Sequence, residues 1–124
     1  MPVRTKRWND PADPDDGFRV LVCRYRPRGV RKDDEPWDGW MEDLGPSRAL
    51  HADYYGKQGP PISWADYRAR YLEEMKSQRP LIEQLAGRVR RGETVTLLCS
   101  SRCLDEERCH RSLLRGLIER AVAR

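Results

Sequence analysis

The residue run with the clearest structural meaning is Phe18-Arg19-Val20-Leu21-Val22-Cys23-Arg24. It is short, rich in β-branched residues and almost continuously apolar, which is typical of a strand covered on both faces. A second run of the same kind, Thr94-Val95-Thr96-Leu97-Leu98-Cys99, lies near the end of the chain. Two buried strands separated by helical segments predict an α/β fold with a mostly parallel sheet.

Two helices are predicted between these strands. Ser63 is suited to cap the first helix, and Asp66 three residues later completes a short-carboxylate version of the capping box. Pro80 suits the first turn of the second helix, and Gly92 is well placed to end it. The apolar residues of both segments recur at helical spacing and are expected to face the core: Trp64, Tyr67, Tyr71, Leu72 and Met75 in the first, and Leu81, Ile82, Leu85 and Val89 in the second.

The two ends of the chain supply one further strand and one further helix. The segment from Val3 to Trp8 is suited to a short first strand. The last helix is expected to begin near Cys109 or His110, and its apolar face is made by Leu113, Leu114, Leu117, Ile118, Ala121 and Val122. Together these elements predict a single domain, residues 1–124, in which helices pack on a small open, mostly parallel sheet.

Two stretches between residues 36 and 62 have a weaker pattern. The stretch from Pro36 to Asp43 is predicted to hold a short helix carrying Trp37 and Trp40, whose rings are expected in the core. The stretch from Leu44 to Ile62 is interrupted by glycines and prolines and is interpreted as a long irregular segment. A long segment without regular structure is often functional, or it contains a missed element.

The composition predicts a soluble protein with a mild positive charge. Charged residues make up 35% of the 124 residues, and 24 Lys and Arg against 20 Asp and Glu give a net charge of +4. No apolar run is long enough to span a bilayer and the N-terminus lacks an apolar signal segment, so a cytoplasmic location without membrane contact is predicted. In a reducing compartment the four cysteines are expected to be thiols, metal ligands or reactive groups rather than disulfides.

A ligand is expected at the carboxyl ends of the two buried strands, because open parallel sheets bind ligands there. The loop after the first strand carries Arg24 and Arg28, and the loop after the second leads to Arg111 in the last helix. Guanidinium groups and free helix N–H groups both favour phosphate or carboxylate. These three arginines are therefore predicted to hold an anionic small molecule or a nucleotide.

The candidate catalytic residues are Cys109, His110 and Cys99. A cysteine at a helix N-terminus near arginine has a stabilised thiolate, and the thiolate is the nucleophile. Cys109 has that position, His110 follows it as a proton carrier, and Cys99 ends the second strand. The alternative is that Cys99 packs as a small hydrophobic residue while His110 is solvated or caps the helix. The sequence leaves open whether the protein is an enzyme.

A zinc-stabilised domain is a further alternative. Its ligands would be Cys99, Cys103, Cys109 and His110, of which the first two form one pair of suitable spacing. Cys109 and His110 are neighbours, and neighbours on a helix point about 100° apart, which is awkward for one ion. The first choice from the sequence is therefore a protein without a metal or another cofactor.

The basic loop of residues 24–32 suggests a different class of partner. Tyr25 lies between Arg24 and Arg26, and an aromatic ring among guanidinium groups can stack on nucleic-acid bases. A nucleic-acid or protein-binding module that uses this loop is therefore kept as an alternative. The sequence assigns no oligomeric state.

A set of short motifs is spread over nearly the whole chain: Asp10-Pro11, residues 16–22, Arg24, Pro27-Arg28-Gly29, Trp40, Pro46-Ser47, Tyr67-Arg68, Tyr71-Leu72-Glu73 and residues 95–98. Together they resemble the family called domain of unknown function 488 (DUF488). One branch of that family closes with a strand ending in Cys, a loop and then Cys-His-Arg, and Cys99 and Cys109-His110-Arg111 match this pattern. The resemblance implies a compact α/β sandwich and no settled activity.

Two positions depart from the pattern of that family. Cys23 stands where the family usually has Asp, and Ser101 stands where it often has Glu. An acid–base role for those carboxylates is therefore not carried over to this chain. Cys103 looks like an addition to the pattern.

Overall fold

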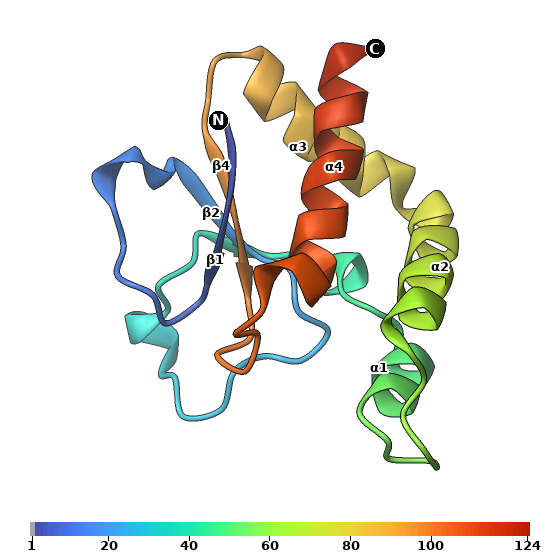
Figure 1. Ribbon diagram of the computed structural model, residues 1–124. Coiled ribbons are helices and arrows are strands. Elements are labelled where there is room, and N and C mark those ends of the chain that lie inside the picture. Colours follow the sequence, from blue (N-terminus) through green and yellow to red (C-terminus); the bar gives the residue numbers. More distant parts are fainter. Residues whose placement is uncertain (1) are drawn as a thin grey trace.

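The computed structural model describes residues 2–124, which form one parallel sheet and a layer of helices (Figure 1). The strands in this range are β1 (Val3–Arg7), β2 (Phe18–Leu21), β3 (Gly39–Trp40) and β4 (Val95–Cys99), in the order β1-β4-β2-β3 across the sheet. Every neighbouring pair of strands is parallel. The α/β fold with a small open sheet, predicted from the sequence, is confirmed.

The α-helices of residues 2–124 are α1 (Arg48–Tyr54), α2 (Trp64–Met75), α3 (Arg79–Arg90) and α4 (His110–Ala123). The capping residues predicted for the later helices are confirmed, since the Ser63 hydroxyl accepts a bond from an amide of the first turn of α2 and α3 begins with a proline in its first turn. Short 3-10 turns lie at Pro14–Asp16, Lys32–Asp34, Glu42–Leu44, Lys76–Gln78 and Glu106–Arg108.

The sheet is covered on both faces, as the apolar strands predict. Val20 of β2 and Leu97 of β4 belong to the larger apolar core, which the helices share, and Figure 1 shows the α-helices on one side of the strands. The alternate residues Leu21 and Leu98 pack with Trp37 in a second apolar cluster, formed largely by loop residues. A helix layer on one side and loops on the other therefore shield the strands from water.

The helix predicted between Pro36 and Asp43 is wrong, because this segment forms β3 instead. The backbone N–H groups of Asp38 and Met41 donate to carbonyl groups of β2, so main-chain pairing with a sheet edge replaces the helical bonds. Trp37 is buried, as expected, but Trp40 is 40% exposed and the prediction that it lies in the core is wrong.

The irregular segment expected from Leu44 to Ile62 contains α1. Ser47 caps this helix through a bond from the Leu50 N–H to its hydroxyl, and the Glu74 carboxylate of α2 accepts bonds from both the amide and the hydroxyl of Ser47. Leu50 is fully buried. The Ser47 cap, the buried Leu50 and the contact with Glu74 therefore stabilise a helix that is too short to show a clear apolar periodicity.

A buried carboxylate ties the N-terminal strands to the loop between them. Asp16 is almost fully buried and forms ion pairs with Arg4, Lys6 and Arg19. Its Oδ2 also accepts the backbone N–H of Asp13, which completes a capping box around the turn. A carboxylate with this many donors is stabilised in its charged form.

Among residues 2–124, no helix is both long enough and apolar enough to cross a bilayer.

Candidate functional site at the carboxyl ends of β2 and β4

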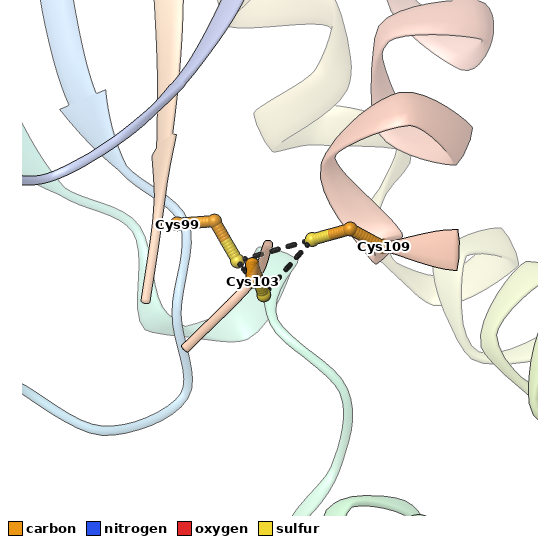
Figure 2. Close-up of side chains that lie close together, drawn as sticks. All are labelled: Cys99, Cys103 and Cys109. Carbon is orange, nitrogen blue, oxygen red and sulfur yellow. Dashed lines mark hydrogen bonds between the residues drawn. The ribbon is translucent and has the colours of Figure 1, made fainter. Parts of the chain in front are cut away.

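Three cysteine side chains converge beyond the end of β4. The Sγ atoms of Cys99 and Cys103 lie 3.0 Å apart, and the Cys109 Sγ lies 3.2 Å from each of them. Figure 2 shows the three sulfurs pointing toward one another from β4, from the loop that follows it and from the start of α4. Cys99 and Cys109 are buried, whereas Cys103 is half-buried.

The local backbone brings these sulfurs together. A turn after β4, closed by a 3.0 Å bond from the Cys103 N–H to the Ser100 carbonyl, directs Cys103 back over Cys99. Cys109 precedes α4 with extended backbone angles (φ −133°, ψ 144°) and makes no side-chain cap bond. Its thiol is therefore free to point toward the end of the strand.

His110 brings an imidazole nitrogen to the same place. Its Nδ1 lies 3.8 Å from the Cys99 Sγ and 4.0 Å from the Cys109 Sγ, while its Nε2 lies 2.8 Å from the Val22 carbonyl oxygen. A carbonyl oxygen only accepts, so Nε2 carries the hydrogen and the Nδ1 lone pair faces the sulfurs. Burial lowers the pKa of His110, which keeps the ring neutral.

The thiols also change one another's proton affinity. Hydrogen bonds from the Cys109 and Cys99 thiols lower the pKa of the Cys103 thiol, because two S–H donors stabilise its thiolate. The hydrogen bond that Cys109 gives to Cys103 raises the pKa of Cys109 in turn. The metal-free cluster therefore loses its first proton easily, from the most exposed sulfur, and its second with difficulty.

A cavity of about 100 Å³ opens beside this cluster. Its wall is made by the ends of β2 and β4 together with residues from α1, α2 and α4, which include Arg24, Tyr25, His51, Tyr55, Cys99, Cys103 and His110. The cavity thus lies at the sheet edge where open parallel sheets bind their ligands.

The three arginines predicted to bind an anion occupy different surroundings. Arg24 lines the cavity, but its guanidinium donates to the Pro46 carbonyl at 2.9 Å and to Asp43 Oδ1 at 3.0 Å. Arg28 is exposed and is not part of the cavity wall. Arg111 is only 6% exposed and contacts the cluster instead, with Nη2 3.5 Å from the Cys103 carbonyl oxygen. The structure therefore brings only Arg24 of the three to the cavity.

An aromatic group forms at the cavity around His51, which was not singled out from the sequence, although Tyr25 was named as a stacking residue. The His51 ring lies 5.1 Å from the Tyr25 ring and 4.5 Å from the Tyr55 ring, measured between centroids. The Arg48 guanidinium carbon and the Lys57 Nζ lie 5.8 and 5.9 Å from the Tyr25 centroid. The sequence signal for this group was the i, i+4 pair of His51 and Tyr55 behind a serine cap, which places both rings on one helix face.

Residues 3–122 match the sequence profile of a family described as "Active DUF488-N3 subclade". The chain belongs to this family. The DUF488 resemblance found in the motifs is therefore confirmed. Among curated proteins, this DUF488-N3 chain is similar to the uncharacterised protein YeaO of Escherichia coli strain K12, with 33% identity over 102 residues that cover 82% of this chain and 85% of YeaO.

This DUF488-N3 chain is also 40% identical over 88 residues to the uncharacterised protein Rv3073c of Mycobacterium tuberculosis strain H37Rv, which covers 69% of this chain and 72% of that protein. No solved structure matches the chain. Cys23 also lines the cavity.

Proposed function

We propose that this DUF488-N3 protein binds a small anionic ligand that contains a planar ring, such as a nucleotide, at the cavity beyond β2 and β4. The observation that carries the proposal is the group made by Tyr25, His51 and Tyr55 with Arg48 and Lys57. Tyr25 and Tyr55 are 44% and 47% exposed at the cavity. Exposed aromatic rings beside cations are suited to a ligand with one flat apolar part and one anionic part.

The two cations are available for a ligand. Within residues 2–124, Arg48 and Lys57 form no ion pair, whereas Arg24 is paired with Asp43. A guanidinium and an ammonium group that both lie within 6 Å of one tyrosine ring are suited to the oxygens of a phosphate. The anionic part of the ligand is therefore assigned to the α1 side of the cavity rather than to Arg28.

His51 supplies a polar contact for the ring of the ligand. Its Nδ1 is buried and has no hydrogen-bond partner among the described residues. Burial lowers the pKa of His51, with a further effect of the Lys57 charge, so the ring is neutral near pH 7. A neutral imidazole offers one donor and one acceptor, which suits the edge of a heterocycle.

The test is calorimetric titration of the full-length protein with AMP, with adenosine and with inorganic phosphate. Binding of AMP that exceeds the binding of either part supports the proposal, because the site recognises both parts. Absence of AMP binding at millimolar concentration overturns it. Tighter binding of a single-stranded oligonucleotide than of AMP would assign the same surface to nucleic acid instead.

A second candidate function is thiol chemistry, which the position of Cys103 favours. Cys103 is half-buried and lines the cavity, so a bound ligand would contact its sulfur. The measurement is the rate of alkylation by iodoacetamide, in which the sulfur displaces iodide and the thiol proton leaves to solvent. Alkylation at Cys103 that AMP slows would support this function, and equal reactivity of all four cysteines would contradict it.

A further inference from the structure

We propose that Cys99, Cys103, Cys109 and His110 bind one zinc ion through three thiolates and the imidazole Nδ1. This metal centre goes beyond the ligand site proposed above and rests on different contacts. The three sulfurs lie within 4.8 Å of one another and two of them are buried. Three sulfur ligands and one nitrogen ligand select a soft or borderline metal such as zinc rather than magnesium or calcium.

Five of the six distances between the ligand atoms are within about 1 Å of those of a tetrahedral zinc site. With Zn–S distances of about 2.3 Å and a Zn–N distance of about 2.0 Å, a tetrahedron places its sulfurs about 3.8 Å apart and the nitrogen about 3.5 Å from each sulfur. The Nδ1 of His110 lies 3.8 and 4.0 Å from the Cys99 and Cys109 sulfurs. It lies more than 4.8 Å from the Cys103 sulfur, so Cys103 and His110 must approach each other by more than about 1 Å to share one ion. The sulfurs, now 3.0 to 3.2 Å apart, need to separate by about 0.6 to 0.8 Å.

Cys109 and His110 do not have the helical spacing that would make them awkward ligands for one ion. Cys109 lies outside α4, in extended conformation, and only His110 has helical geometry. The two side chains therefore follow no helical spacing, and both reach the cluster. The expected difficulty assumed that Cys109 belongs to the last helix, whereas α4 begins at His110.

The Val22 carbonyl fixes the imidazole in the form that a metal needs. Its 2.8 Å contact with Nε2 holds the hydrogen there and turns the unprotonated Nδ1 toward the sulfurs. Metal-bound histidines commonly donate their other ring N–H in this way, which fixes both tautomer and ring orientation. His110 is thus prepared as a ligand by a residue of the neighbouring strand end.

Arg111 supplies the charge that such a centre requires. Zn²⁺ with three thiolates and a neutral imidazole carries one net negative charge. The buried Arg111 guanidinium lies at the Cys103 carbonyl, and its Nε and Nη1 have no hydrogen-bond partner among residues 2–124. A buried cation is costly unless an anion lies beside it, and an anionic zinc–thiolate centre would supply that negative charge.

The consequence of four protein ligands is a closed, structural site. Catalytic zinc sites keep a position open for water or substrate, whereas a Cys₃His set fills the tetrahedron. The ion would join the end of β4, the following turn and the start of α4, and through His110 the end of β2. Cys103 would then be a ligand rather than a nucleophile, so metal binding and the thiol function exclude one another.

The test is the zinc content of the full-length protein, purified without a metal-chelating tag or resin and measured by plasma mass spectrometry. One zinc per chain is expected, with loss in Cys109→Ser and retention in Cys23→Ser, because Cys23 is buried nearby but lies outside the group. Zinc-free, reduced protein should also take up Co²⁺ and develop thiolate-to-cobalt charge-transfer absorption. Protein that holds no zinc and takes up no Co²⁺ overturns the proposal.

A measurement on the unmodified protein covers the case in which the variants do not fold. Titration with a mercurial reagent that caps thiols should release one zinc, detected by a chromogenic chelator, as three thiols react. Release of zinc without thiol modification would place the ion elsewhere and overturn the assignment. The outcome is independent of AMP binding, so failure of one proposal is distinguishable from failure of the other.

Discussion

The imidazole Nε2–H of His110 donates to the backbone carbonyl oxygen of Val22 at 2.8 Å. This bond joins the first residue of α4 to the first residue after β2, which are 88 positions apart in the chain. It therefore fixes the relative position of the two segments that form the candidate site. Any function of the thiol cluster depends on this contact, because it also decides which ring nitrogen faces the sulfurs.

Replacement of this imidazole is expected to destabilise the protein even without metal. His110→Ala leaves the Val22 carbonyl unpaired in a buried environment and opens a cavity, which together cost roughly 2–4 kcal/mol. The free energy of unfolding by urea, measured in the presence of EDTA and reductant, checks this value. His51→Ala, in a half-buried position on α1, is the matched control and should cost less.

Removal of zinc should lower the Tm of the protein only when the cluster of Cys99, Cys103 and Cys109 is intact. An ion present at about 1,000 times its dissociation constant stabilises the folded state by about 4 kcal/mol. EDTA should therefore lower the Tm of the wild-type protein by roughly 10 °C or more. In Cys109→Ser the same chelator should have no effect, and an equal loss in both proteins would argue against this cluster as the binding site.

The Asp16 carboxylate should make stability depend on acid pH. Burial alone would raise the pKa of Asp16, but hydrogen bonds from Lys6, the Asp13 amide and Arg19 outweigh it and lower the pKa. A folded-state pKa below the unfolded value gives stability that is present above the unfolded pKa and is lost as pH falls through the folded pKa. The Tm of the wild-type protein should therefore fall as pH is reduced below about 4.

The variant Asp16→Asn tests this assignment at neutral pH. It leaves the buried Arg19 and the half-buried Lys6 without their counter-charge, for which a cost of about 3 kcal/mol at pH 7 is expected. It should also flatten the dependence of Tm on acid pH. The control is Asp15→Asn, at the neighbouring exposed position. It should change neither the stability at pH 7 nor the dependence of Tm on acid pH appreciably.

Ligand affinity should depend on the ring of Tyr25. Loss of one stacked aromatic ring costs roughly 1–3 kcal/mol, so Tyr25→Ala should weaken AMP binding by about 5- to 150-fold. Lys57→Ala should weaken AMP binding but leave adenosine binding unchanged, because the ammonium group is assigned to the phosphate. Arg68→Ala, an exposed charge on α2 outside the cavity wall, is the control. Equal losses for AMP and adenosine in Lys57→Ala would contradict the assignment.

Two glycine substitutions should have opposite effects on stability. A Cβ atom at Gly45 would clash with the Arg24 backbone nitrogen and lie 2.9 Å from the Cys23 carbonyl carbon, so Gly45→Ala should destabilise the protein and disturb the cavity wall. A Cβ atom at Gly116 of α4 would meet only flexible tips of the Arg120 guanidinium at 3.9 Å. Gly116→Ala should therefore stabilise by about 0.5–1 kcal/mol, measured by urea unfolding.

Much of the fold was predictable because its central elements carry local signals. β2 and β4 are covered on both faces and are therefore almost purely apolar, and α2 begins at a serine cap. β3 carries no such signal. It consists of two residues held by backbone bonds to β2. Two residues are too few to show an alternation of apolar and polar side chains, so the exposure of Trp40 could not be predicted from the sequence.

The candidate site was predictable only as a region. The rule for strand ends correctly placed Cys99, His110 and Arg24 at one edge of the sheet. It could not tell that Asp43 neutralises Arg24, since that pairing depends on a turn that comes 19 residues later. Nor could it show that Cys103 faces the other thiols, because the direction of its side chain is set by the turn after β4.

The sheet order has a consequence for how the protein is made. β4 is the last strand in sequence, yet it lies between β1 and β2, which have no direct contact with each other in the sheet. During synthesis, the strand edges of β1 and β2 that pair with β4 therefore stay unpaired until residues 95–99 leave the ribosome. Unpaired strand edges can bind chaperones or aggregate. The step that completes the sheet is also the step that delivers the first sulfur of the cluster.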